Sequence, residues 1–126
     1  MLDASIRAAE GSHRTLTGIY GRAGQPLEAE ALWKRIGLTP MIGQNDVPDQ
    51  IFTLEDAQGL NAFAQERGVG RMSMWSLNRD LGCSSLDQVQ LPSVATHSCS
   101  GLEGHPGMFA EALGRGFADT DSSAGP

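Results

Sequence analysis

Leu38–Gly43 (LTPMIG) and Gly70–Leu77 (GRMSMWSL) are the two stretches that decide the fold. The first is a short apolar run, and in the second Met72, Met74 and Ser76 would point to one face and Ser73, Trp75 and Leu77 to the other. This predicts two strands, although Pro40 has no N–H to donate in the middle of a sheet. Leu54–Arg67, which lies between them, has apolar residues at helical spacing. A strand, a helix and a strand in this order imply parallel pairing, so the sequence predicts an α/β fold.

Further elements are predicted on both sides of this unit. Thr53 and Asp56 can form a weaker version of the capping box at the start of the central helix, and Gly68 can end it. The other predicted segments are helices at Asp3–Tyr20, Leu27–Ile36 and Pro106–Gly114, a loop at Val47–Phe52, and a disordered tail at 118–126. No internal repeat is found.

Polar side chains follow both predicted strands at their carboxyl ends. In α/β proteins, ligands bind at this edge of the sheet. We therefore expect one functional rim, which contains Gln44, Asn45, Asp46, Trp75, Asn78, Arg79 and Asp80.

Trp75 is the strongest candidate for a binding residue on this rim. It can pack in the core, or it can form a flat apolar floor for a sugar ring while polar neighbours hold the hydroxyl groups. Periodicity leaves both interpretations open, and the polar rim favours the binding role. For Asp80 the structural interpretation is favoured, as an ion pair with Arg79 or as a loop cap.

Charge and composition exclude several classes of function. The chain has 9 basic and 15 acidic residues, a net charge of −6, and no Lys/Arg cluster, which argues against a nucleic-acid partner. It has no basic amphipathic face for a membrane surface and no apolar run of about 20 residues that could span a bilayer. The first residues do not form a secretory signal.

Sequence motifs indicate no cofactor and no metal site. No phosphate-binding loop, dinucleotide fingerprint, nucleophile elbow or zinc-protease motif is present. His13 lies on the apolar stripe of the first helix, where a hydrogen-bonded core histidine is expected. Cys83 and Cys99 are too few for a disulfide scaffold, and their number alone leaves one bridge and two free thiols equally open.

The two strand motifs, LTPMIGQND (Leu38–Asp46) and MSMWSLNRD (Met72–Asp80), resemble bacterial family 18 glycoside hydrolases, the chitinase-type catalytic domain. The resemblance continues in AAEGSHR (Ala8–Arg14) and HSCSG (His97–Gly101) and covers residues 1–117. It implies a partial (β/α)8 TIM barrel. Leu38–Gly43 and Gly70–Leu77 would be its seventh and eighth strands, the helices at Asp3–Tyr20 and Leu54–Arg67 its sixth and seventh helices, and a C-terminal extension would follow.

The resemblance also implies a site and a substrate. Trp75 matches the tryptophan that floors the subsite of the reacting sugar, and Gln44, Asn45 and Asp46 match residues that line the cleft. The implied substrate is chitin, the polymer of β-1,4-linked N-acetylglucosamine, or its oligomers. Cys83 and Cys99 match cysteines that follow the barrel, which favours a disulfide. The family is mostly secreted, whereas this chain shows no export signal, so its localisation stays open.

The catalytic acid of the family has no counterpart in this chain. In the family it is the Glu of an Asp-x-x-Asp-x-Asp-x-Glu motif on strand four, and the sequence contains no such motif. A complete barrel also needs about 250 residues. We therefore expect a C-terminal fragment of a chitinase-like hydrolase, without activity of its own, whose partner would be the missing N-terminal portion of the barrel. The alternatives are a remnant that binds chitin weakly and an unrelated small α/β module.

Overall fold

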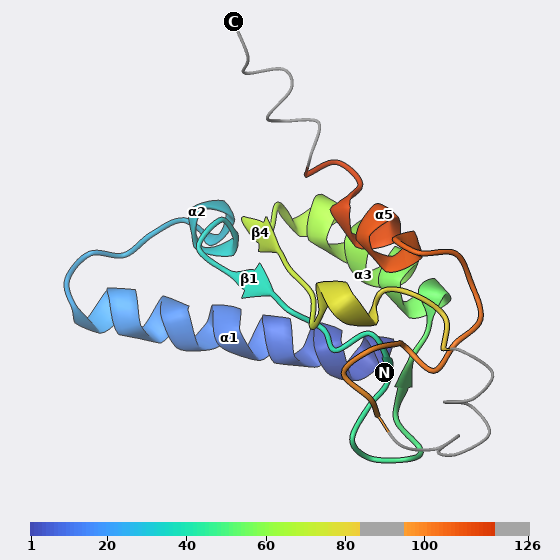
Figure 1. The fold of residues 1–126 in the computed structure, drawn as a ribbon. Coiled ribbons are helices and arrows are strands. Elements are labelled where there is room, and N and C mark those ends of the chain that lie inside the picture. The colour runs from blue at the N-terminus through green and yellow to red at the C-terminus, as the bar shows by residue number, and fades with distance from the viewer. Residues whose placement is uncertain (84–94, 118–126) are drawn as a thin grey trace, which may run out of the picture.

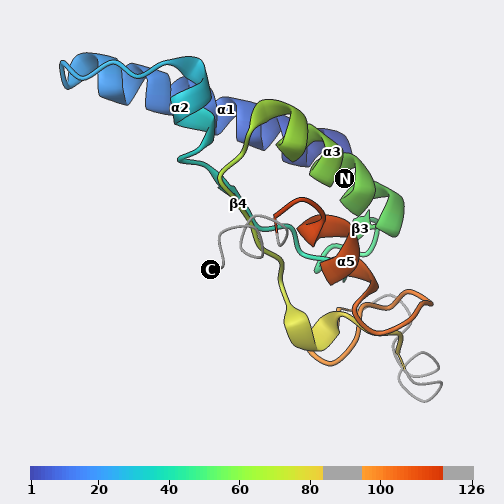
Figure 2. The same ribbon diagram turned by 90° about the horizontal axis from the view of Figure 1, so that it is seen from above.

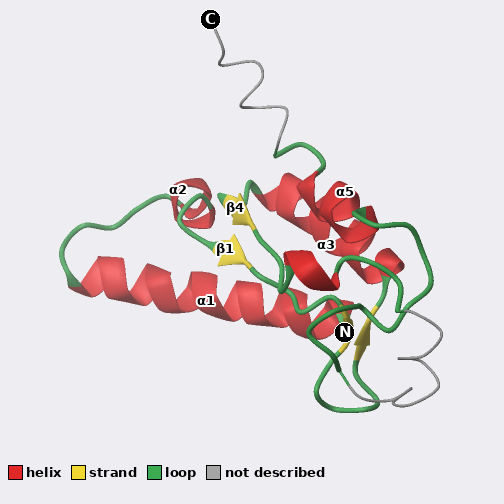
Figure 3. Cartoon of the chain, in the orientation of Figure 1, coloured by secondary structure: helices red, strands yellow, loops and turns green. Residues whose placement is uncertain are grey.

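Strands β1 (Gly37–Leu38) and β4 (Arg71–Met72) pair in parallel, with helix α3 (Leu54–Arg67) in the connection between them. This is the strand–helix–strand unit that the sequence predicts, and it confirms an α/β fold. The structure is a computed structural model that describes residues 1–83 and 95–117; the predicted tail at 118–126 lies outside them. The other elements are α1 (Leu2–Arg22), α2 (Ala29–Trp33), β2 (Gly43–Gln44), β3 (Ile51–Phe52), the 3₁₀ helix η1 (Leu77–Arg79) and α5 (Met108–Gly114) (Figures 1 and 3).

The parallel pairing continues beyond the regular strands. The backbone N–H of Ser73 donates to Leu38 O at 2.8 Å, that of Trp75 to Pro40 O at 2.9 Å, and that of Ile42 to Trp75 O at 3.0 Å. The predicted strands therefore lie side by side along most of their length. Pro40 lacks an N–H, so the ladder misses one hydrogen bond there, and the regular strand is shorter than predicted.

Helix α3 forms where the sequence signals predict it. The Thr53 side chain accepts a hydrogen bond from the Asp56 backbone, and the Asp56 carboxylate accepts one from Thr53 N, which completes the capping box. Gly68 follows the helix with φ 76°, a conformation that glycine adopts without steric cost. Both ends of α3 are thus set by local chemistry.

Two predicted segments differ in the structure. Within the expected loop at Val47–Phe52, Ile51–Phe52 forms β3, which pairs antiparallel with β2. Gly43 therefore belongs to a short hairpin, and not to the preceding strand. The helix predicted at Leu27–Ile36 is only five residues long, Ala29–Trp33.

The hydrophobic core lies between the helices and the β1–β4 pair. Helices α1, α2 and α3 lie on one side of this pair (Figure 2). Leu38, Met72 and Met74 pack from the strands against the core cluster. Its most buried members are Ala9, Ile42, Phe52, Ala57, Leu60, Ala64, Phe109 and Leu113.

His13 joins α1 to α2. Its Nε2 lies 3.0 Å from Ala29 O, and its ring stacks on Trp33 with centroids 4.4 Å apart. The predicted hydrogen bond of this histidine is present, but the residue is only partly buried and does not belong to the buried core. Among the described residues, no helix is long and apolar enough to span a membrane.

Candidate functional site

Trp75 lies at the surface, on the side of the strand pair opposite the core. Its side chain is 53% exposed, whereas Met72 and Met74 on the same strand pack against the core. Successive side chains alternate between the two faces of a strand, which separates Trp75 from these methionines. Met41 pairs with Trp75 across the parallel ladder and so belongs to the same face. The peptide bond between Trp75 and Ser76 is cis.

Gln44 and Asn45 lie at the carboxyl end of the first strand, as predicted, but their amide groups are used inside their own loop. Gln44 is 6% exposed, and its Nε2 donates to Asn45 O at 3.0 Å and Pro48 O at 3.1 Å. Asn45 Nδ2 donates to Met41 O and Gly43 O, both at 3.0 Å. These contacts satisfy carbonyl groups in a tight hairpin, so the two amides hold the loop in shape.

Asp46 differs from its two neighbours because it is exposed. Its carboxylate makes no hydrogen bond in the part of the chain that the structure describes. It acts electrostatically on the Arg79 guanidinium, which lies near it. Of the three polar residues predicted after the first strand, Asp46 therefore has the side chain that is free to meet a ligand.

Arg79 is fully buried and links three segments of the chain. Its Nε donates to Thr96 O at 2.7 Å, one terminal nitrogen donates to Gln44 O at 2.7 Å, and the other donates to Ile42 O. Burial lowers the pKa of Arg79, because the charged form loses its hydration, and Asp46 partly opposes this effect. The sequence placed Arg79 on the functional rim and gave no signal that it is a buried structural cation.

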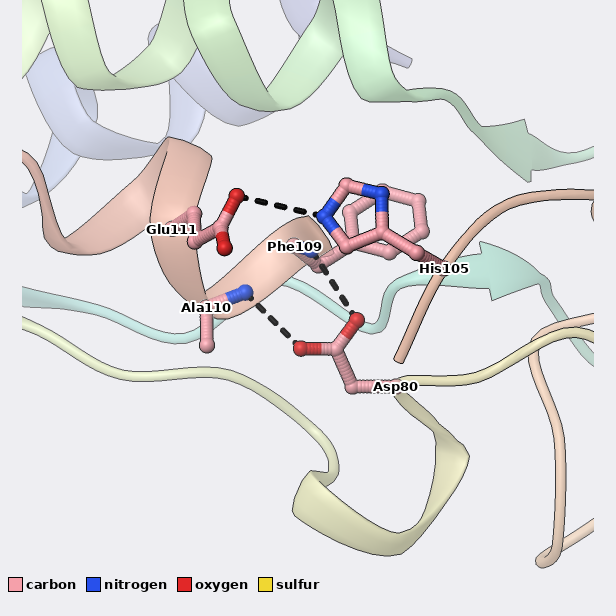
Figure 4. A network of polar contacts seen from close by, with 5 residues as sticks. All are labelled: Asp80, His105, Phe109, Ala110 and Glu111. Carbon is pink, nitrogen blue, oxygen red and sulfur yellow. Dashed lines mark hydrogen bonds and ion pairs between the residues drawn. The ribbon is translucent and has the colours of Figure 1, made fainter. Parts of the chain in front are cut away.

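Asp80 caps helix α5. It is 3% exposed, and its two carboxylate oxygens accept hydrogen bonds from the backbone N–H groups of Phe109 and Ala110, both at 2.9 Å (Figure 4). Gly107, the residue before the helix, has no side chain that could do this. The predicted cap role of Asp80 is thus confirmed, whereas no ion pair joins it to Arg79 in the described part of the chain.

The other two histidines take no part in this arrangement. His97 is exposed, and His105 is exposed with its Nε2 3.2 Å from the Glu111 carboxylate (Figure 4). No group of histidine, cysteine and acidic side chains that could hold a metal ion is present within the described residues.

A disulfide between Cys83 and Cys99 fixes the segment 96–100 beside the rim. The Cα atoms of the two cysteines are 4.9 Å apart. Ser100 O accepts from the backbone N–H of Gln44 at 2.7 Å, and His97 O accepts from Asn78 Nδ2. The approach to Ser100 is so close that a Cβ atom on Gly43 would lie 2.1 Å from its carbonyl oxygen.

Reduction of this disulfide is expected to destabilise the chain by about 3 kcal/mol, the chain-entropy value for a loop of this length. The bond closes a sequence separation of 16, and the chain has no other cysteine. The measurement is urea unfolding with and without reductant. A double variant, Cys83→Ser with Cys99→Ser, should unfold like the reduced protein and should not respond to reductant. Equal midpoints for oxidised and reduced protein would show that the bond contributes nothing.

The arrangement is suited to binding a flat, partly apolar ligand. An exposed indole lies on one strand, and the loop that follows the neighbouring strand carries an exposed carboxylate. That loop is held by Arg79, Gln44 and Asn45. The carboxylate of Asp80 is already engaged by two N–H groups, which leaves Asp46 as the acidic side chain available on this rim.

Comparisons with known proteins identify relatives of this chain. No model of a known protein family matches it. Endochitinase 11 from Metarhizium anisopliae and a probable bifunctional chitinase/lysozyme from Escherichia coli K12 are each 38% identical over 69 residues, which is 55% of this chain. The chain covers only 12% and 7% of these two relatives.

Solved structures extend the similarity over almost the whole chain. The catalytic domain of a hyperthermophilic chitinase from Pyrococcus furiosus matches 90% of this chain with a TM-score of 0.77 and 32% identity. A catalytic-site mutant of active domain 2 of that organism's chitinase, complexed with chito-oligosaccharides, matches 99% with a TM-score of 0.76 and 30% identity. The chain covers 34% and 36% of these two structures.

The relatives come from Metarhizium anisopliae, Escherichia coli and Pyrococcus furiosus, so the comparisons do not show that the chain is of the bacterial type that the sequence resemblance suggested. Their printed names all describe chitinases, which agrees with the chitinase-type domain that the sequence motifs resemble. The chain is similar to chitinase catalytic domains and spans about a third of the length of the solved structures that it matches.

Proposed function

We propose that residues 1–117 are the C-terminal portion of a chitinase-type catalytic domain and form an incomplete (β/α)8 barrel. The segment from β1 to Gly43 would be its seventh strand, and the segment from β4 to Leu77 its eighth. The parallel pairing of these segments across α3 supports the proposal, because a TIM barrel consists of such units. The share of the solved catalytic domains that the chain covers, 34% to 36%, agrees with it.

The proposed ligand is chitin or an oligomer of β-1,4-linked N-acetylglucosamine. The observation that carries this proposal is the half-exposed Trp75 side chain on the face away from the core. A sugar ring presents axial C–H bonds to an aromatic plane, while its hydroxyl and acetamido groups need polar partners. Asp46 is exposed and would accept such hydrogen bonds, and Gln44 and Asn45 would hold the loop that carries it.

Binding by this chain alone is expected to be weak. One stacking surface on an incomplete cleft is consistent with a dissociation constant in the millimolar range, a binding free energy of about −4 kcal/mol. The predicted activity of the chain is therefore the retention of chitin oligomers without their hydrolysis.

Trp75→Ala is expected to abolish retention on chitin, because it removes the apolar plane that contacts the sugar. The measurement is the fraction of purified protein that sediments with chitin beads. Ile19→Ala is the matched control, since Ile19 is an exposed apolar side chain on α1, far along the chain from Trp75. If Trp75→Ala sediments as well as the unchanged protein, or if the unchanged protein is not retained, the proposed chitin site is wrong.

A further inference from the structure

The clamp segment, residues 96–100, connects the disulfide to the candidate site. Figures 1 and 2 show this segment, in orange, beside η1, in yellow. Three of its backbone carbonyl groups accept hydrogen bonds from rim residues: Thr96 O from Arg79 Nε at 2.7 Å, His97 O from Asn78 Nδ2, and Ser100 O from Gln44 N at 2.7 Å. Two of these donors follow Trp75 in the chain, and the third lies two residues before Asp46. The clamp segment therefore holds together the two stretches that carry the proposed sugar contacts.

The disulfide is the covalent anchor of the clamp segment. Cys99 lies within the segment and is 2% exposed, whereas Cys83 follows η1 and is half-buried. The segment belongs to no helix and no strand, so no regular ladder of hydrogen bonds holds it. Without the S–S bond, it is attached to the rim by individual hydrogen bonds, and segments attached in this way open most easily.

The surroundings of the two sulfur atoms suit reduction by a dithiol. Cys83 is the more accessible end, so a thiolate of the reductant attacks its Sγ, which breaks the S–S bond and releases Cys99 as a thiolate. Thr96 Oγ1 lies 3.2 Å from Cys99 Sγ and can donate a hydrogen bond to this leaving group. The second thiol of the reductant then displaces Cys83. In total, two electrons and two protons pass to the cysteines, and the dithiol becomes a cyclic disulfide.

We propose that the Cys83–Cys99 disulfide is a redox switch of the sugar site, which binds in the oxidised chain and is weakened when a dithiol reductant releases the clamp segment. The inference rests on the proposed function. Release of the segment lets water compete for the carbonyl groups that hold Arg79, Asn78 and Gln44. Trp75 and Asp46 then lose their fixed spacing, and a ligand that contacts both must bear the cost of ordering them.

Binding and reduction are linked equilibria, so each must change the other by the same factor. If reduction weakens the binding of an N-acetylglucosamine oligomer tenfold, a saturating concentration of that oligomer shifts the ratio of reduced to oxidised chain tenfold toward the disulfide. A disulfide that only adds to the stability of the fold has no such reciprocal effect while both forms of the chain remain folded.

The release of the clamp segment can be measured without any sugar. The full 126-residue chain is compared before and after reduction with dithiothreitol, with circular dichroism as the check that both forms are folded. The Gln44 amide should exchange its hydrogen at least tenfold faster after reduction, whereas the amides of α3 should keep their protection. Thr96→Val removes the hydroxyl group beside Cys99 and should slow reduction at least threefold, whereas Thr15→Val, at an exposed position of α1, should not.

The effect on the sugar site is measured by titration with an N-acetylglucosamine oligomer and by retention on chitin beads. The reduced chain and the double variant, Cys83→Ser with Cys99→Ser, should bind at least tenfold more weakly than the oxidised chain. Oligomer at saturation should shift the equilibrium with dithiothreitol toward the disulfide, and Trp75→Ala should remove that shift.

One further variant decides the matter if the reduced chain is unfolded. Asn78→Asp keeps the disulfide and the acceptor for Ser76 Oγ but removes the donor to His97 O, so it should weaken binding at least threefold. Gln25→Glu makes the same change of charge at an exposed position and should leave binding unaltered.

Two failures of this experiment are distinguishable. If the oxidised chain does not bind the oligomer, the proposed function is wrong and the switch falls with it. If the oxidised chain binds and the folded reduced chain binds equally well, or the Gln44 amide stays protected after reduction, the redox switch alone is overturned. Where the reduced chain is unfolded, equal binding by Asn78→Asp and Gln25→Glu overturns it.

Discussion

Arg79→Met is expected to lower the free energy of unfolding by about 3 kcal/mol or more, which is large for a small domain. The guanidinium group donates to carbonyl groups of Ile42, Gln44 and Thr96, so it links the segment of Arg79 to two others, 42–44 and the segment around Thr96. A methionine has similar length and no donor, so these carbonyl groups would lose their partner in a buried position. Each unsatisfied buried group costs about 1–3 kcal/mol, and local rearrangement would recover part of that cost.

The measurement is the urea midpoint, followed by circular dichroism and by tryptophan fluorescence. Arg79→Lys should be nearly as destabilised, because a lysine ammonium group is compact and does not reproduce the planar fork of donors. Arg14→Met is the control, because Arg14 is exposed on α1, and surface changes of this kind stay within about 0.5 kcal/mol. An Arg79→Met midpoint equal to that of Arg14→Met would show that the guanidinium group does not hold the three segments together.

Local signals explain which parts of the fold could be predicted. The start of α3 follows from Thr53 and Asp56, three residues apart, and its end follows from Gly68. Both ends of the helix were predicted correctly from these local signals. The interruption at Pro40 follows from a missing N–H, and the sequence shows it directly. The hairpin of β2 and β3 was missed because only two residues of each strand pair, which is too short for an alternating pattern.

The candidate site shows the same limit in its polar residues. The sequence could place four polar residues at the ends of the strands: Gln44, Asn45, Arg79 and Asp80. It could not show that their side chains form hydrogen bonds with backbone groups and are therefore not available to a ligand. Those partners are distant in sequence: Arg79 meets Ile42, and Asp80 meets Phe109. For Trp75 the sequence left core and surface open, and the exposure of its side chain decides between them.

The chain alone is expected not to hydrolyse chitin oligomers, although it is expected to bind them. General acid catalysis contributes about 10²–10⁴-fold to such reactions and needs a carboxylic acid that can deliver a proton to the glycosidic oxygen. The acidic motif of the resembled family is absent from the sequence. Asp80 is a poor substitute, since both of its oxygens accept N–H groups at 2.9 Å. Asp46 has no hydrogen bond in the described residues that would orient it for proton transfer.

The measurement is the release of chromophore from an aryl glycoside of an N-acetylglucosamine oligomer. The complete catalytic domain from Pyrococcus furiosus, assayed under the same conditions, shows that the substrate and detection are adequate. The expected rate for this chain is that of the heat-inactivated sample. Turnover above that background that disappears in both Trp75→Ala and Asp46→Asn would contradict the prediction, because it would show a reaction that depends on this site. Turnover that neither substitution changes would point to a contaminating hydrolase, because a reaction on this face of the strand pair depends on the indole that holds the sugar.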